Sequence, residues 1–418
     1  MSAKYKEYKK LDLSRIGKEI KAFWETHEVF GKSLELRKDC KPWVFYEGPP
    51  SANGLPGIHH VLARTIKDIF CRYRTQKGHL VNRKAGWDTH GLPVEIGVEK
   101  MLGITKEDIG QSISIAGYNQ ACRTDVMKYK DIWDDLTIRM GYWVDLNNPY
   151  LTFDNKYIET VWYLLARLYE KGLLYKGYSI QPYSPAAGTG LSTHELNQPG
   201  CYRNVKDNSV TAQFKIVRNA KSAFLFGHGS DPVYFLAWTT TPWTLPSNTG
   251  LAVGKNIEYI LVKTFNQYTF EPIQVILAKD LLENFFDPLN AGLKMEEYKP
   301  GDKRIPYQVL ASYMGLDFEN IRYEQLLPYT LPVEGDPFRV VLGDFVTTGD
   351  GTGIVHIAPS FGADDFKIGR QYGLGSLTMV DKRGRFVETM GEFGGRYVRP
   401  EYENGSVNTR PVDVDIII

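Results

Sequence analysis

The sequence has few cysteines and no long apolar segment. Its four cysteines, Cys40, Cys71, Cys122 and Cys201, are widely scattered, so neither a disulfide framework nor a Cys-x-x-Cys zinc site is predicted. No stretch approaches the ~20 consecutive apolar residues of a membrane span, and the first ten residues lack the apolar core of a signal peptide. These absences predict a cytoplasmic protein that contacts no membrane.

An excess of charge of one sign is also lacking. Lys and Arg total 50 against 49 Asp and Glu, a net charge of +1, so any contact with RNA depends on local basic clusters. The densest cluster is better explained by itself as a solvated helix face. It consists of Arg64, Lys67, Arg72, Arg74, Lys77, Arg83 and Lys84.

The first half of the chain has the pattern of alternating strands and helices. Short strands are predicted at 43–46 and from 80 to about 88, and helices at 13–29, 61–73, 119–140 and 155–171. Ser14 is the expected N-cap of the first helix. In the last helix, the predicted buried stripe is Ile158, Val161, Trp162, Leu165 and Leu168. A strand, a tight loop and a helix at 43–73 indicate the first crossover of a doubly wound parallel sheet.

From about residue 188 the pattern changes to short β-rich runs between Gly, Pro, Asn and Asp clusters. The runs lie at 211–217, 234–237, 259–262, 274–278 and 339–342. The predicted fold class is therefore α/β, with the first half of a doubly wound, Rossmann-like sheet and an inserted, mostly β domain. The predicted divisions are a helical segment at 1–40, a nucleotide-binding region at 41–187 and the β insert at 188–418.

One motif cluster has the character of a nucleotide site. Residues 48–60 read Gly-Pro-Pro-Ser-Ala-Asn-Gly-Leu-Pro-Gly-Ile-His-His, and they end where a helix is predicted to begin. The free N–H groups of a helix N-terminus favour phosphate, and His59 and His60 stand at that point. Two histidines alone are more often solvated caps, but the frame around them is specific.

This frame resembles the class I aminoacyl-tRNA synthetases, whose signature His-Ile-Gly-His lies in the same context. Residues 86–95, Gly-Trp-Asp-Thr-His-Gly-Leu-Pro-Val-Glu, are similar to the isoleucyl-tRNA synthetases. The first and third signature positions are exchanged, as Gly57 and His59, and only His60 keeps its place. The resemblance implies that Asp88 binds the α-amino group of isoleucine.

By the same resemblance, His59 and His60 are catalytic, and the other residues that bind isoleucine and ATP are Gly48, Pro49, Asn53 and Gly57. ATP with Mg²⁺, isoleucine and tRNA(Ile) are the expected substrates of a monomeric ligase. Tyr-Ser-Pro-Ala-Ala at 183–187 stands where many relatives carry a zinc knuckle, so no zinc is expected there.

A second cluster implies hydrolysis. Residues 238–246, Trp-Thr-Thr-Thr-Pro-Trp-Thr-Leu-Pro, and 351–359, Gly-Thr-Gly-Ile-Val-His-Ile-Ala-Pro, resemble the editing segments of isoleucyl-tRNA synthetases. A threonine run alone is typical of a sheet face. By the resemblance, Asp365 anchors the amino group of mischarged valine and His356 excludes isoleucine. The editing threonines are Thr239, Thr240, Thr241 and Thr244, which hold the terminal adenosine and a water. We expect the threonine segment and Asp365 to share one cavity.

The chain shows no Lys-Met-Ser-Lys-Ser loop and has an apolar ending at 411–418. The interpretation is an N-terminal fragment with a truncated editing insert, inactive in aminoacylation. Two alternatives stay open: a free-standing aminoacyl-tRNA deacylase and a non-catalytic tRNA-binding module.

Overall fold

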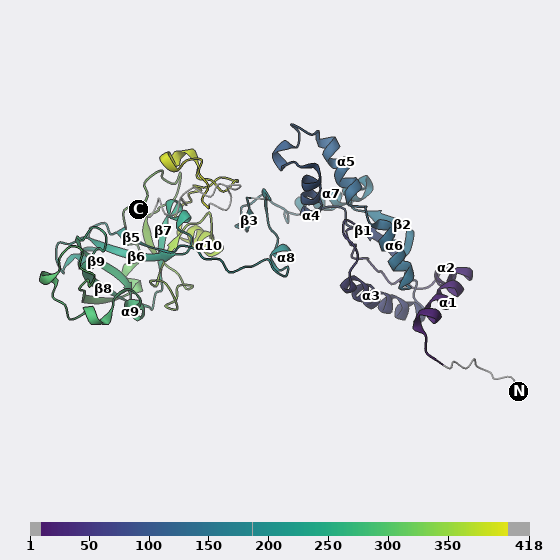
Figure 1. Cartoon of the computed structure of the whole chain (residues 1–418), viewed down its shortest axis with the longest axis horizontal. Coiled ribbons are helices and arrows are strands. Elements are labelled where there is room, and N and C mark those ends of the chain that lie inside the picture. The colour runs from purple at the N-terminus through teal and green to yellow at the C-terminus, as the bar shows by residue number, and fades with distance from the viewer. Residues whose placement is uncertain (1–9, 186, 400–418) are drawn as a thin grey trace. The chain divides into compact units, whose positions relative to one another are not determined.

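The structure is a computed structural model that describes residues 10–185 and 187–399. The chain divides into two compact units, Met1–Lys176 and Gly177–Ile418 (Figure 1). The ending at 411–418 lies outside the described residues. In the described ranges, no helix combines the length and the apolar character needed to cross a bilayer.

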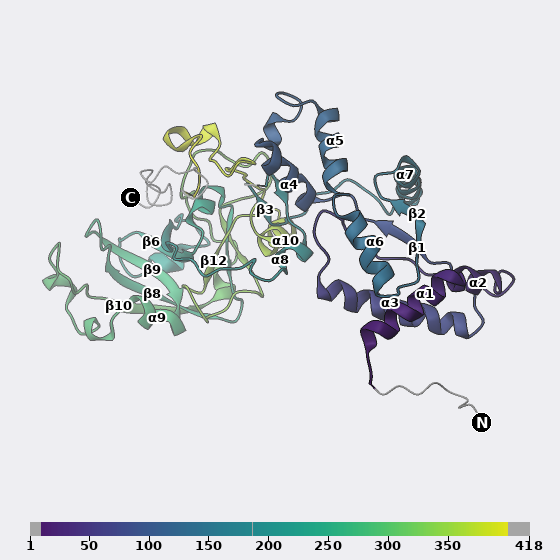
Figure 2. The same ribbon diagram turned by 45° about the vertical axis from the view of Figure 1, so that its right-hand side comes forward.

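The first unit is α/β. Strands β1 (Lys84–Trp87) and β2 (Asp145–Leu151) pair in parallel, and parallel strands need a long crossover, here supplied by helices. The helices of this unit are α1 (Leu13–Thr26), α2 (Val29–Glu35), α3 (Ile58–Gln76), α4 (Leu92–Leu102), α5 (Ile115–Asp125), α6 (Lys130–Arg139) and α7 (Asn155–Glu170). Figure 2 shows α6 running beside the β1–β2 pair.

Three local predictions for this unit are wrong. No strand forms at 43–46: only a parallel bridge joins Pro42 to Leu80, and Tyr46 is 86% exposed, because the extended segment has a partner on one side alone. The N-cap of α1 is Asp12, whose carboxylate accepts the Arg15 N–H at 3.0 Å, since it directly precedes the helix.

The third correction concerns the helix predicted at 119–140, which is two helices, α5 and α6. The break comes where the Tyr129 N–H donates to the Ala52 carbonyl at 3.0 Å. This hydrogen bond ties the N-terminal end of α6 to the loop of the first motif cluster, a tertiary contact that helical periodicity does not reveal.

The exposed faces of α3 and α7 also contradict the sequence analysis. Both helices form, but α7 buries none of its residues within the described chain, and Trp162 of the predicted buried stripe is 68% exposed. In α3 the buried residues are Arg64, Cys71 and Thr75. Its apolar residues Leu62, Ile66, Ile69, Phe70 and Tyr73 are all exposed.

The basic cluster of the first unit is not a simple solvated face. Arg64 and Arg83 are 7% and 2% exposed, and the Arg72 guanidinium pairs with Asp68 at 2.6 Å. These three cations stabilise the interior of the unit, so they do not form a free surface for RNA.

The second unit is built from two main sheets. The five-stranded sheet has the order β10-β8-β9-β6-β5, and the three-stranded sheet has the order β11-β7-β12. The strands are β5 (Val210–Lys215), β6 (Val233–Thr239), β7 (Gly250–Val253), β8 (Glu258–Phe265), β9 (Pro272–Ala278), β10 (Gln308–Met314), β11 (Arg339–Leu342) and β12 (Ile354–Ile357), with a small hairpin of β3 (Tyr183–Ser184) and β4 (Thr189–Gly190). The helices are α8 (Thr193–Leu196), α9 (Leu282–Phe285) and α10 (Ala363–Tyr372).

The core of the second unit explains its continuous apolar runs. In β8, Tyr259 and Leu261 face the cluster shared with the three-stranded sheet, while Ile260 and Val262 face a second cluster near α9. Both faces of the sheet are buried, so the strand is apolar at successive positions. All five predicted β runs are confirmed; β7, β10, β12 and α10 were not predicted.

Candidate active sites

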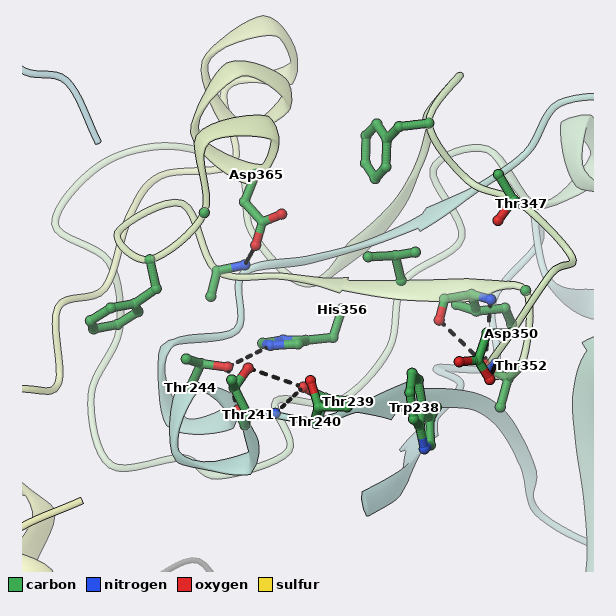
Figure 3. Close-up of a pocket in the computed structure, with 18 residues that line it drawn as sticks. Trp238, Thr239, Thr240, Thr241, Thr244, Thr347, Asp350, Thr352, His356 and Asp365 are labelled. Atoms are coloured by element: carbon green, nitrogen blue, oxygen red, sulfur yellow. Dashed lines mark hydrogen bonds between the residues drawn. The ribbon is translucent and has the colours of Figure 1, made fainter. Parts of the chain in front are cut away.

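The second unit has a cavity of about 390 Å³ where the end of β6 meets β12 and α10. It brings together every predicted editing residue: Thr239, Thr240, Thr241, Thr244, His356 and Asp365. Figure 3 shows Thr241 and Thr244 against His356, with Asp365 projecting from the start of a helix nearby. The expectation of one shared cavity is confirmed.

The threonine segment is shaped by its own hydrogen bonds. Strand β6 ends at Thr239, whose hydroxyl oxygen accepts the Thr241 N–H at 3.1 Å and lies 3.3 Å from the Thr241 hydroxyl. Pro242 then opens a 3-10 turn, Pro242–Ser247, in which the Thr244 hydroxyl donates to the Thr241 carbonyl at 2.7 Å. A strand end followed by a proline turn therefore groups several hydroxyls at one point.

His356 is held from β12, and its side chain is 8% exposed. Its Nε2 lies 2.9 Å from the Thr244 Oγ1, a contact between residues 112 positions apart in the sequence. Burial lowers the pKa of His356 to about 4, because desolvation disfavours the charged form. The imidazole is therefore neutral at neutral pH and cannot attract a carboxylate as a cation.

Asp365 lies in the first turn of α10, and its Oδ2 accepts the Ala358 N–H at 2.9 Å. Burial raises the pKa of this carboxyl. A Cβ at Gly362, in the preceding loop, would lie 2.8 Å from the Asp365 Cγ, so a larger residue there would displace the carboxylate. A carboxylate that is removed from water and lines a cavity is suited to bind an ammonium group.

The first unit has its own cavity, of about 470 Å³, beside the start of α3. Of the predicted residues, it brings together Gly48, Pro49, Asn53, His60 and Asp88. His59 and Gly57 are not among its lining residues. Lys67 and Arg64, both on α3, also line this cavity together with Asp88. The cavity lining therefore contains two cations and a carboxylate.

The geometry at the start of α3 accounts for the exchanged signature positions. Gly57 is the N-cap, and its N–H donates to the His60 Nδ1 at 2.9 Å, so the ring proton of the neutral imidazole is on Nε2. Burial and the neighbouring His59 lower the pKa of His60. A Cβ on Gly57 would lie 2.8 Å from the His59 ring. The His59 ring therefore occupies space that a side chain at position 57 would need.

Comparison with known proteins decides the family. A family model described as tRNA synthetases class I (I, L, M and V) matches residues 19–326. The chain belongs to this family. The isoleucine–tRNA ligase of Bacteroides fragilis is 58% identical over 416 residues, covering 100% of this chain and 36% of the relative. That of Porphyromonas gingivalis is 60% identical over 398 residues, covering 95% of this chain and 34% of the relative.

The chain thus spans about 36% of the length of such a relative. A solved structure, the editing domain of the P. knowlesi cytosolic leucyl-tRNA synthetase, is 15% identical and covers 40% of this chain and 64% of its own, with a TM-score of 0.29.

Sequence analysis missed Trp133. Its Nε1–H donates to the Gly54 carbonyl at 2.9 Å, and its ring lies edge-on to that of His60 at 4.7 Å. Trp133 lines the first cavity and is 1% exposed. Trp133 therefore contacts both the loop that contains Gly54 and the ring of His60. Its only signal in the sequence is its position within a predicted helix.

Buried Glu47 was also missed: it pairs with Lys67 and accepts a hydrogen bond from the Tyr142 hydroxyl. In the described ranges of this synthetase chain, no three His, Cys, Asp or Glu side chains are grouped to hold a metal ion.

Proposed function

We propose that this chain is the N-terminal part of an isoleucine–tRNA ligase whose second unit hydrolyses mischarged Val-tRNA(Ile). The supporting observation is that one cavity gathers every predicted editing residue, and that another gathers the predicted activation residues except Gly57 and His59. The names of the relatives at 58% and 60% identity support the choice of isoleucine. We further propose that the β1–β2 pair is the first half of a doubly wound, Rossmann-like sheet.

In the whole protein, the proposed substrates are isoleucine, ATP with Mg²⁺ and tRNA(Ile), and the protein is a cytoplasmic monomer. Asp88 binds the α-ammonium of isoleucine. The His60 Nε2–H, with the free N–H groups at the start of α3, donates to the phosphates of ATP and stabilises the charge that develops during adenylate formation. Lys67, held by Glu47, adds a fixed positive charge to that wall.

In the editing cavity, Asp365 binds the ammonium of the esterified valine, while Thr239, Thr240 and Thr241 bind the terminal ribose and a water. Thr244 holds His356, whose ring limits the room for the side chain. No covalent nucleophile is needed, because the ester is already reactive and a bound, oriented water supplies much of the rate enhancement.

The test measures release of valine from Val-tRNA(Ile) by the purified chain, with Ile-tRNA(Ile) as the competing ester. We expect hydrolysis of the valyl ester only. Asp365→Ala removes the ammonium partner and should abolish hydrolysis. Asp364→Ala is the matched control, since Asp364 is an exposed carboxylate in the same first turn of α10.

Three outcomes separate the candidate functions. Hydrolysis by Asp365→Ala at the normal rate would refute the editing assignment. Binding of tRNA(Ile) without any hydrolysis would favour a non-catalytic binding module. Isoleucine-dependent ATP–pyrophosphate exchange by the full-length protein supports the ligase, and its absence there would leave only a deacylase.

A further inference from the structure

A chain of hydrogen bonds runs from the core of the second unit to the threonine turn. It begins at Tyr323, whose hydroxyl donates to the Asn248 Oδ1 at 2.7 Å. The Asn248 Nδ2 donates to the Gly250 carbonyl at 2.8 Å and lies 3.3 Å from the His356 Nδ1. Neither Tyr323 nor Asn248 lines the cavity, so both act on it through other residues.

The direction of each hydrogen bond follows from the chemistry of the groups. An amide NH₂ has no acceptor site, so the His356 Nδ1 must be the acceptor and the ring proton must be on Nε2. The Nε2–H then donates to the Thr244 Oγ1 at 2.9 Å. The single proton of that hydroxyl goes to the Thr241 carbonyl, 2.7 Å away.

The orientation of the Asn248 amide is the step on which the rest depends. If the amide turned by 180°, its oxygen would face the His356 Nδ1 and would select the opposite tautomer. The Gly250 carbonyl prevents this, because it can only accept and a turned amide would present its oxygen to it in place of the Nδ2–H. The Tyr323 hydroxyl supplies the donor for the Asn248 oxygen in the observed orientation. Tyr323 is 2% exposed, and its ring is packed edge-on against Phe214 at 5.3 Å and Phe338 at 6.2 Å.

We propose that Asn248, held by the Gly250 carbonyl, is a positioning residue that fixes His356 as the Nε2–H tautomer. The Thr244 hydroxyl then accepts from the ring and donates to the Thr241 carbonyl. The Thr239 oxygen already accepts the Thr241 N–H at 3.1 Å. The Thr239 and Thr241 hydroxyls lie 3.3 Å apart, so one donates to the other and the remaining proton is left for a ligand in the cavity. That this ligand is an aminoacyl ester rests on the proposed function; the tautomer does not.

The charged groups around His356 are compatible with this assignment. Asp350 and Asp365 line the same cavity, and the Asp365 carboxylate is bonded to the Ala358 N–H. Tyr323 is the titratable group at the far end of the chain of bonds, and burial raises its pKa, so it remains a hydrogen-bond donor. His356 itself remains neutral, because burial lowers its pKa to about 4.

Nitrogen-15 NMR of the histidine-labelled chain tests the tautomer directly. We expect His356 of the wild type to be Nε2–H and neutral down to about pH 4. Tyr323→Phe should leave the Nε2–H tautomer in place, because the Gly250 carbonyl still requires the Asn248 NH₂. Asn248→Asp should move the ring proton to Nδ1 and shift the titration of His356 to higher pH, because a carboxylate accepts and stabilises the imidazolium.

Tyr259→Phe is the matched control. Tyr259 is as buried as Tyr323, and its hydroxyl also donates a 2.7 Å hydrogen bond, to the Gly353 carbonyl. It should lose a similar amount of thermal stability without any change in the His356 tautomer. A wild-type Nδ1–H tautomer, or an Asn248→Asp spectrum identical to that of the wild type, would overturn the proposal.

Hydrolysis of Val-tRNA(Ile) gives the second readout. Asn248→Asp should lower kcat about ten-fold with little change in KM, because the ring no longer donates to Thr244 and the Thr244 hydroxyl turns from the Thr241 carbonyl to the ring. An Nδ1–H tautomer with an unchanged kcat would refute the positioning role. If the wild type hydrolyses nothing, the proposed function fails, while the NMR result still decides the tautomer.

Discussion

Acidification should destabilise the second unit through His356. The ordinary pKa of a histidine is about 6.5, and burial lowers that of His356 to about 4. Between pH 6.5 and about pH 4, the imidazole is therefore protonated in the unfolded chain and neutral in the folded chain. The contribution of the neutral imidazole to stability is fully present above pH 6.5 and is lost as the pH falls toward 4. One pKa unit corresponds to about 1.36 kcal/mol, so the difference amounts to roughly 3 kcal/mol.

The assay measures the free energy of unfolding of the second unit at several pH values from 7 to 4.5. Hydrogen exchange of amides in the five-stranded sheet reports this free energy. His356→Gln is the comparison, because a neutral amide can donate to Thr244 but does not titrate. The wild type should lose stability more steeply than this variant as the pH falls.

Asp365 acts with the opposite sign, which makes the comparison with the variant necessary. Burial raises the pKa of its carboxyl, so its contribution to stability is present at low pH and is lost as the pH rises through that pKa. This effect is common to both proteins and cancels in the difference. Parallel pH profiles of the wild type and His356→Gln would show that His356 is not a buried neutral imidazole.

Three further predictions concern other parts of the chain. Gly353→Ala should destabilise the second unit by ~3 kcal/mol in urea unfolding, since φ is +73° and a Cβ would lie 2.4 Å from a β9 side chain; Gly349→Ala, whose nearest neighbour is 3.9 Å away, should be neutral. Phe70→Lys, at 59% exposure on α3, should change the unfolding free energy of the first unit by less than about 0.5 kcal/mol, and a large loss would show that this face is covered. His60→Ala in the full-length protein should slow ATP–pyrophosphate exchange ~100-fold or more, and a near-normal rate would show that the signature is misaligned.

Sequence patterns predicted the second unit better than the first. In β8 and β9 the apolar residues are consecutive because both faces of the sheet are buried, and this signal does not depend on what covers them. In α3 and α7 the period of the apolar residues is correct for a helix, but it reports only that one face is apolar. The structure leaves the apolar face of α3 and the apolar face of α7 exposed within the first unit. The spacing of apolar residues cannot predict whether another element covers such a face.

The candidate sites show the same division. The amino-acid order, through its resemblance to the synthetase motifs, predicted Thr241, His356, Asp365, His60 and Asp88 as site residues, because each stands in a dense and specific local motif. Only the tertiary structure decided that Asn248 contacts Tyr323 and the His356 ring and that Trp133 holds the loop before α3. These contacts join residues 75 to 108 positions apart. Such partners are chosen by the pairing of strands and the packing of helices, which bring side chains together without leaving any pattern in the neighbouring sequence.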